Sequence, residues 1–386
     1  MKIALINLVV DTNYGGNLQR YALCKVLNRM GHDVFYIPTY SKLVYPHGVK
    51  AFLIYTKRRI HNIFSKNKKN VFLERDTARE YVIQLPQVEQ FIEKNIPCYN
   101  RVYGENDNMS DLNRYGFDAF LVGSDQVWRS SSKSNIEHFF LDFVSTNQKK
   151  IAYAVSFGND GSSYTKKQII NCGKLYKHFD AISFREETAF KITNKFKWNN
   201  KNEPSLVLDP TLLLNKEAYT SLIDESSVIG KKGIFCYVLD MNSDVKKLID
   251  FVVAKKQLPY FLVDTLFPNR DHPKNKEYLM NPSIGQWLKN ISEADFIITD
   301  SFHGTMFSLI FNKPFITIVN AKRGRERYFP LIKNIGLNNR LVNDLQHIDW
   351  REIEHVIQRN INYDYVHRKI DEERVRSINF LKNNLS

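Results

Sequence analysis

The chain has 386 residues and a formal net charge of +14, from 55 Lys and Arg against 41 Asp and Glu. Apolar residues at 43% and charged residues at 25% exclude a largely disordered chain, and no run reaches the roughly 18 uncharged apolar residues of a membrane span. The length predicts two domains, and the charge favours anionic partners such as phosphorylated metabolites or anionic lipid.

Four cysteines, at positions 24, 98, 172 and 236, are far apart and form no CxxC motif. Neither a zinc site nor a disulfide scaffold is predicted, and a reducing compartment fits this spacing. The N-terminal run MKIALINLVV is followed at once by Asp11 and has no small-residue cleavage site, which favours a first strand over a signal peptide. We expect a cytoplasmic protein, with a peripheral position at the inner face of the plasma membrane left open.

The first half of the chain alternates apolar runs with helix-like segments. Residues 2–10 predict a strand, DTNYGG a loop, and residues 17–31 a helix that ends at Gly31. Strands are then expected in HDVFYIP, DAFLV, KIAYAVS and AISF. This order predicts a parallel sheet covered on both faces, in an N-terminal Rossmann-like domain over residues 1–200.

A second α/β unit is predicted over residues 205–345, after the hydrophilic stretch KFKWNNKNEP. Its strands are expected in SLVLDPTLLL, GIFCYVL, LPYFLVD, ADFIITD and FITIV. Residues 350–386 are predicted to form amphipathic helices that pack across the domains. The predicted fold class is α/β, with two doubly wound Rossmann-like domains that face a cleft.

The segment 42–79 is strongly basic, with ten Lys or Arg and two acidic residues. One interpretation is a solvated basic helix. The other is a surface that rests on anionic lipid headgroups, because Phe, Leu, Ile and Tyr alternate with the cations. No aromatic stacking motif or zinc-finger spacing is present, so no specific nucleic-acid partner is predicted.

Polar side chains that follow the predicted strands are the candidate site residues, because ligands bind beyond the carboxyl ends of parallel strands. They are Asn17, then Asp125, Gln126 and Trp128 in GSDQVW, Arg185 in SFREE, and Ser301, His303 and Gly304 in TDSFHG. Arg185 could hold a carboxylate or phosphate, or pair with Glu186 or Glu187. Asp125 could be only a helix cap, and Trp128 either a platform for a sugar or a core residue.

His303 is predicted at the start of a helix, where Ser301 or Thr305 can cap and Gly304 permits close approach of a ligand. The helix dipole opposes an imidazolium there, and a bound phosphate would reverse this preference and permit proton donation. A packing histidine is the alternative.

Other motifs are less informative. Gly15-Gly16 matches neither a dinucleotide nor a Walker loop, and no DxD pair is present, so neither a metal nor a cofactor is expected. The loop NAKRGRER, with Arg323, Arg325 and Arg327, is either a phosphate contact or a solvated loop.

Six stretches in this order resemble the polysaccharide pyruvyl transferases: NYGGNLQRYAL, FLVGSDQVW, AVSFG, ISFREE, VLDPTLLL and TDSFHGTMFSLIFNKPF. The similarity runs from about residue 3 to about residue 345. It implies a GT-B-like fold and transfer of the pyruvyl group of phosphoenolpyruvate to two hydroxyls of a sugar, as a cyclic ketal. Such enzymes serve bacterial capsule, exopolysaccharide or cell-wall glycan synthesis, often on a lipid-linked saccharide.

The resemblance implies roles for individual residues, with Arg185 and His303 as the essential arginine and histidine. Phosphoenolpyruvate would be bound by Arg185 and by the helix start at Ser301, His303 and Gly304. His303 would protonate the vinyl carbon or support phosphate departure, and Asp125 would act as base. The acceptor-side candidates are Asn17, Gln126 and Trp128. The alternatives are a GT-B glycosyltransferase with a nucleotide-sugar donor and an inactive glycan-binding scaffold.

Overall fold

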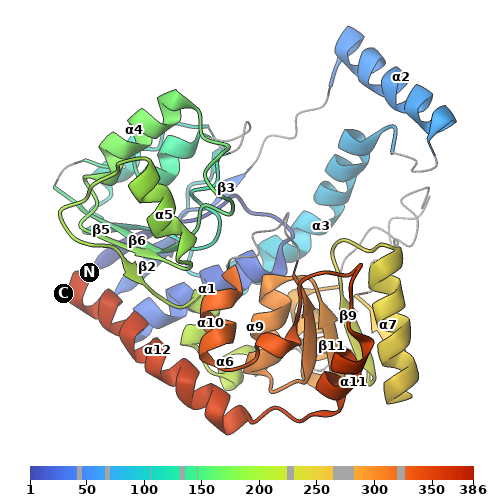
Figure 1. Cartoon of the computed structure of the whole chain (residues 1–386). Helices are drawn as coiled ribbons and strands as arrows, with labels where there is room; N and C mark the ends of the chain where they lie inside the picture. The colour runs from blue at the N-terminus through green and yellow to red at the C-terminus, as the bar shows by residue number, and fades with distance from the viewer. Residues whose placement is uncertain are drawn as a thin grey trace.

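The computed structural model describes residues 1–40, 46–65, 70–104, 106–130, 135–145, 147–223, 230–263, 282–319 and 327–386. Within these ranges the chain forms two large parallel sheets, each with helices packed on it, a small two-stranded parallel sheet, and a long C-terminal helix that passes along both large sheets (Figure 1). The fold is therefore α/β, with two Rossmann-like domains arranged in the GT-B manner.

The first sheet, among the described residues, has six parallel strands in the order β2-β1-β5-β6-β7-β8. The strands are β1 (Lys2–Ile6), β2 (Asp33–Tyr36), β5 (Ala119–Val122), β6 (Lys149–Val155), β7 (Ala181–Phe184) and β8 (Ser205–Leu206). The other elements of this half are α1 (Tyr14–Arg29), β3 (Thr39–Tyr40), α2 (Gly48–Phe64), α3 (Leu73–Asn95), β4 (Tyr103–Gly104), α4 (Lys166–Tyr176), α5 (Thr188–Lys195) and the 3₁₀ turns η1 (Ser110–Arg114) and η2 (Ile136–Phe140). Every residue of β5 and β7 is buried, as expected for strands covered on both faces.

The second sheet, in the described part of the chain, has five parallel strands in the order β10-β9-β11-β12-β13. The strands are β9 (Ile234–Tyr237), β10 (Tyr260–Leu262), β11 (Phe296–Thr299), β12 (Phe315–Ile318) and β13 (Leu341–Val342). The accompanying helices are α6 (Lys216–Thr220), α7 (Ser243–Lys256), α8 (Ile284–Glu293), α9 (Phe302–Ile310), α10 (Phe329–Asn334), α11 (Trp350–Gln358) and α12 (Tyr363–Asn384), with the 3₁₀ turns η3 (Pro210–Leu213) and η7 (Asn338–Arg340).

In each large sheet the strand order reverses at one strand. The chain first adds a strand on one side of it and later continues on its other side. In the first sheet β1 lies between β2 and β5, and in the second sheet β9 lies between β10 and β11. The loops after such strands diverge and leave a crevice at the carboxyl edge of the sheet, where ligands of doubly wound folds bind. The segments GSDQVW and TDSFHG follow β5 and β11, so both predicted site segments lie at these positions.

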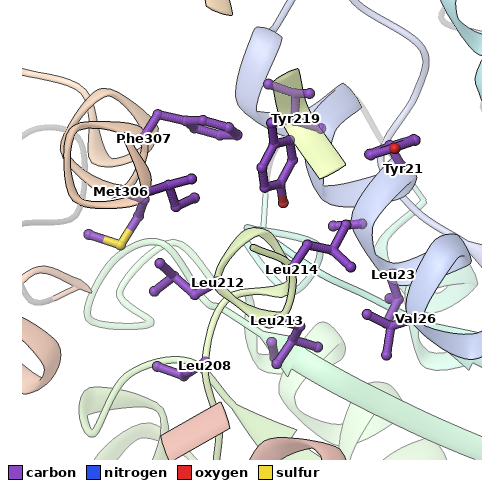
Figure 2. Packing of buried hydrophobic residues seen from close by; sticks show 14 of the residues in the cluster. Tyr21, Leu23, Val26, Leu208, Leu212, Leu213, Leu214, Tyr219, Met306 and Phe307 are labelled. Atoms are coloured by element: carbon purple, nitrogen blue, oxygen red, sulfur yellow. The ribbon is translucent and has the colours of Figure 1, made fainter. Parts of the chain in front are cut away.

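An apolar layer joins the two domains. Residues 207–214 connect the sheets and lie between α1 and α9. Figure 2 shows leucines of this connection beside Met306 and Phe307 of α9 on one side and Leu23 and Val26 of α1 on the other. One continuous buried cluster includes side chains from both sheets. Because a large apolar interface opposes relative movement, the two domains are held together by this layer.

The C-terminal segment forms two helices, and α12 bridges the domains. At its start the hydroxyl of Tyr363 donates a hydrogen bond to the carbonyl of Lys313 in the second domain. Further along, the hydroxyl of Ser377 accepts a hydrogen bond from the backbone N–H of Leu208, beside β8 of the first sheet, at 2.9 Å. The helix therefore runs along both domains, as Figure 1 shows at its lower edge.

The predicted strand SLVLDPTLLL is wrong in its placement and its length. Ser205–Leu206 adds β8 to the edge of the first sheet, and the second sheet begins only at β9. The strand ends early because Asp209 caps a 3₁₀ turn, accepting a hydrogen bond from the N–H of Thr211 at 3.0 Å. Pro210 has no N–H for a strand ladder, so the apolar run continues as η3.

The predicted helix over 17–31 is α1, and Gly31 follows its end with a left-handed φ of 87°, which glycine adopts without strain. Of the basic segment 42–79, residues 42–45 and 66–69 lie outside the described residues, and the rest forms α2 and the start of α3. None of the helices in the described ranges combines the length and hydropathy that a bilayer span requires.

Leu212→Ala should lower the free energy of unfolding by about 2–5 kcal/mol, because truncation leaves a cavity in the apolar layer between the domains. Urea denaturation followed by tryptophan fluorescence measures this loss. The control is Leu53→Ala, at a side chain that is 61% exposed, which should change stability by about 0.5 kcal/mol or less. Equal stability of the two variants would contradict a joining role for this layer.

Candidate active site

His303 lies in the first turn of α9, directly beyond the end of β11. Ser301 is the N-cap, and its hydroxyl accepts a hydrogen bond from the N–H of Gly304 at 3.3 Å. A Cβ on Gly304 would come within 2.3 Å of the Thr299 hydroxyl. The glycine therefore permits a tight turn from strand to helix, and its bare side faces protein rather than open space. This turn holds the imidazole at the carboxyl edge of the second sheet.

The imidazole of His303 packs against the first domain. A Cβ added to Gly15 would lie 1.9 Å from His303 Nδ1, so only glycine fits at this position of α1. Asn13 caps the same helix by accepting a hydrogen bond from the N–H of Gly16 at 3.3 Å. The N-termini of α1 and α9 thus meet across the domain boundary. Packing of Gly15 against His303 therefore explains a glycine in the NYGG motif without nucleotide binding.

Arg185 follows β7, and its guanidinium is buried and ion-paired. Nη2 donates to Asp125 Oδ1 at 2.9 Å and Nη1 donates to Asp209 Oδ2 at 2.8 Å. Nε lies 3.7 Å from the nearer carboxylate oxygen of Glu186. The sequence left open whether Arg185 holds a ligand or forms an ion pair, and in this conformation Arg185 forms ion pairs. Its close partners are Asp125 and Asp209.

Asp209 brings Arg185 and His303 together. Its Oδ2 accepts hydrogen bonds from Arg185 Nη1 and from Gln19 Nε2, the latter at 2.5 Å, and lies 3.7 Å from His303 Nε2. The prediction that an arginine of one domain and a histidine of the other approach the same place agrees with this geometry. Asp209 itself was missed, because VLDP was placed inside a predicted strand that continued to Leu214. A search for polar residues after the end of β8, at Leu206, would have selected Asp209.

Asp209 is held ionised. Burial alone would raise the pKa of this carboxyl, but His303 and then Arg185 outweigh burial and hold the pKa of Asp209 far below its ordinary value of 3.8. The hydroxyl and the N–H of Thr211 also donate to Oδ1, at 2.7 and 3.0 Å. Asp209 therefore carries a negative charge at neutral pH inside the domain contact.

Asp125 is a poor proton acceptor. Burial would raise its pKa, yet the charges of Arg185, His303 and Arg327 together lower the pKa of Asp125 below 3.8. No helix begins in the described residues 126–130 that follow it, so Asp125 is not the helix cap that the sequence allowed. A carboxylate that is both ion-paired and weakly basic does not suit the role of base predicted for it.

The environment of Glu186 shifts its pKa in the opposite direction from that of Asp125. Burial raises the pKa of this carboxyl, and the opposing charge of Arg185 does not cancel the effect. One oxygen of Glu186 and the Nε of Arg185 have no hydrogen-bond partner among the described residues, although both are buried. Buried polar atoms without partners cost free energy, and within a candidate site they indicate where a ligand can bind.

Arg327 belongs to this cluster and not to a solvated loop. It is buried, its Nη1 lies 3.5 Å from Asp125 Oδ1, and its guanidinium carbon lies 5.3 Å from the centre of the Phe302 ring. The guanidinium carbon of Arg185 lies 4.7 Å from the same ring centre. Two cations therefore gather over one aromatic ring at the start of α9. Arg323 and Arg325 lie outside the described residues.

Metal ligation is not indicated in the described part of the chain, where no three His, Cys, Asp or Glu side chains are placed to hold a metal ion. The charges of Asp125 and Asp209 are instead balanced by guanidinium groups.

Two of the three acceptor-side predictions are wrong. Trp128 is fully buried, with its ring centre 4.5 Å from that of Phe140 in a stacked arrangement, and its Nε1 donates to the carbonyl of Phe139. Asn17 is also fully buried, and its amide donates to backbone carbonyls of the preceding loop. Neither side chain can contact a sugar. Gln126 is partly exposed and stays a prediction.

Asp209→Asn should lower the free energy of unfolding at neutral pH by about 3–5 kcal/mol, because it removes one of the two carboxylates that pair closely with the buried Arg185. A lowered carboxyl pKa stabilises the fold above the unfolded-state pKa, and this contribution is lost as the pH falls. The difference in unfolding free energy between the variant and the unaltered protein should therefore become smaller below about pH 3.8. Asp250→Asn, which removes an exposed ion pair with Lys246, is the control and should change little. Equal urea midpoints for the two variants would contradict the assignment.

Several solved structures match over most of the chain. They include a UDP-GlcNAc 2-epimerase from Methanocaldococcus jannaschii, at 12% identity and TM-score 0.48, covering 94% of this chain and 93% of that chain. A UDP-glucosyltransferase from Polygonum tinctorium has 11% identity and TM-score 0.46, with 99% and 97% covered. The heptosyltransferase WaaC from E. coli has 10% identity and TM-score 0.39, with 93% and 99% covered. Similarity this low has no bearing on activity.

No curated protein matches the sequence. The family model of the polysaccharide pyruvyl transferases matches residues 13–322, which is most of the chain and contains Asp125, Arg185, Asp209 and His303. The chain belongs to the polysaccharide pyruvyl transferase family.

Proposed function

We propose that this transferase takes the pyruvyl group from phosphoenolpyruvate and joins it to two hydroxyls of a sugar as a cyclic ketal. The acceptor is a saccharide, free or lipid-linked, in bacterial capsule, exopolysaccharide or cell-wall glycan synthesis. The observation that carries the proposal is the convergence of Arg185 and His303, from different domains, on the buried Asp209.

The donor carries a carboxylate and a phosphate, and the cluster offers cationic groups for both. Arg185 Nε is buried without a hydrogen-bond partner, and the guanidinium of Arg327 lies over the same Phe302 ring. The first turn of α9 adds backbone N–H groups and the positive end of a helix dipole. We expect one anionic group of the donor to bind the guanidinium groups and the other to bind the start of α9 at Ser301 and His303.

The chemistry needs proton transfers at defined atoms. A proton adds to the methylene carbon of the enol, and the central carbon becomes electrophilic with oxocarbenium character. One sugar hydroxyl attacks this carbon, the bond to the phosphate oxygen breaks, and the second hydroxyl attacks to close the ketal ring. Of the two hydroxyl protons released, one balances the proton on the new methyl group and the other leaves with inorganic phosphate.

His303 and Glu186 are the two groups that we assign to these transfers. His303 Nε2 is buried without a hydrogen-bond partner at the contact between the domains, where it can donate to the methylene carbon or to the departing phosphate. Glu186 replaces Asp125 as the proposed base, because burial raises its pKa whereas that of Asp125 is lowered. Environments that push the pKa values of neighbouring carboxyls apart are typical of acid–base pairs in enzymes.

Incubation of candidate acceptor saccharides with phosphoenolpyruvate and the enzyme should yield a pyruvyl ketal, detected by mass spectrometry, with release of inorganic phosphate. His303→Ala should lower turnover by roughly 10²- to 10⁴-fold while the protein stays folded. Calorimetric titration provides the second measurement, with binding expected for phosphoenolpyruvate and not for UDP- or GDP-sugars. Binding of a nucleotide sugar without phosphoenolpyruvate would overturn the proposal in favour of a glycosyltransferase.

Glu186→Gln should lower kcat by roughly 10²- to 10⁴-fold, because the amide cannot accept a proton. In the unaltered enzyme the rate should fall as the pH drops through the raised pKa of Glu186, and the variant should lack this limb. The matched control is Glu187→Gln, at the exposed neighbouring residue. A variant that retains the acid limb, or turns over as fast as the control, would remove Glu186 from proton transfer.

A further inference from the structure

Helix α2 carries an apolar face that the described protein does not cover. None of its residues is buried, and Figure 1 shows the helix projecting away from both sheets, beyond the end of α3. Six of its apolar side chains are between 51% and 85% exposed: Val49, Phe52, Leu53, Ile60, Ile63 and Phe64. Single exposed apolar residues are ordinary, but six on one short helix indicate an interaction surface.

The six side chains form one stripe. At 3.6 residues per turn they fall within about 120° of the helix circumference. Lys50 and Lys57 lie along one edge of the stripe, and Arg59 lies along the other. The helix contains no Asp or Glu. An apolar stripe bordered by cations is the pattern of a helix that lies in the interface of a bilayer.

The opposite face of α2 is fixed to the protein. The ring centre of Tyr55 lies 5.0 Å from that of Phe72, just before α3, and Arg58 forms two hydrogen bonds of 2.6 Å with the carboxylate of Glu74. A surface helix normally turns its apolar stripe toward the core and its charges toward water. Here a mixed, partly charged face docks on the protein, and the apolar stripe is directed outward.

We infer that α2 docks the protein on an anionic lipid surface. The charge of the helix selects this occupant over a second copy of the chain. Two α2 helices packed stripe to stripe would bring six like charges together, from Lys50, Lys57 and Arg59 of each copy, with no acidic side chain of α2 to offset them. An anionic bilayer suits both the apolar stripe and the cations of α2, because its acyl region accepts the stripe and its headgroups attract the cations. The inference does not depend on the identity of donor or acceptor.

Vesicle co-sedimentation of the full chain tests the inference, with phosphatidylcholine vesicles that contain or lack phosphatidylglycerol. The unaltered protein should bind the anionic vesicles, and binding should weaken at high salt. Lys50→Glu with Lys57→Glu should weaken binding by roughly 30-fold or more, from about 1 kcal/mol per lysine near an anionic surface. Phe52→Asp with Ile63→Asp should weaken it by at least roughly tenfold.

Helix α4 supplies matched controls, because Lys166, Lys167 and Ile170 are also exposed. Lys166→Glu with Lys167→Glu, and Ile170→Asp, should bind vesicles as the unaltered protein does. Thermal unfolding should be unchanged in the α2 variants, since the altered side chains lie outside the core. Equal loss of binding in the α4 and α2 variants would overturn the inference. A dimer in lipid-free solution that Phe52→Asp with Ile63→Asp dissociates would also overturn it, in favour of a second copy.

Discussion

The site depends on one buried carboxylate, that of Asp209. Its two oxygens hold the start of η3, Gln19 of α1 and Arg185 after β7, and His303 lies 3.7 Å away. A charge removed from water is tolerated only when it is paired and hydrogen-bonded. The elements that supply these partners must therefore assemble around Asp209 for the core to close. The same contact that organises the domain boundary fixes the arginine and positions it near the histidine.

Contacts within the first domain and contacts across the boundary differ in length. Arg185 reaches Asp125 and Asp209 of its own domain at 2.9 and 2.8 Å. The ion-pair distances that cross the boundary are longer, at 3.7 Å for His303 to Asp209 and 3.5 Å for Arg327 to Asp125. A small movement of the second domain would thus break few strong interactions in the site. The apolar layer of Figure 2 holds the domains in register, whereas the ion-pair distances across the polar boundary are the longer ones.

The sequence predicts the strand ends well, because buried parallel strands are continuous apolar runs and the polar residues after them stand out. His303 and Arg185 were selected as candidates in this way. Trp128 was misplaced because its burial is determined by Phe140, twelve residues further along the chain and in a different element, which no local pattern reveals. Asp209 was missed for a related reason, since a two-residue strand at a sheet edge has too few residues to show a period. Pairing between distant segments, rather than local preference, determines both positions.

Charge balance links donor binding to proton uptake in the proposed reaction. Among the described residues of the cluster, the carboxyls of Asp125, Asp209 and Glu186 stand against the guanidiniums of Arg185 and Arg327. A donor with a carboxylate and a phosphate adds negative charge to a buried region that already holds more acidic than guanidinium groups. Asp125 and Asp209 cannot relieve this repulsion, because their pKa values are lowered and they stay ionised. Glu186, with its raised pKa, is the carboxyl that can take up a proton, and in the proposed reaction this proton comes from the attacking sugar hydroxyl. In the proposed reaction, the asymmetry among the three carboxyls therefore lets one of them accept a proton beside a polyanionic donor while the other two stay ionised.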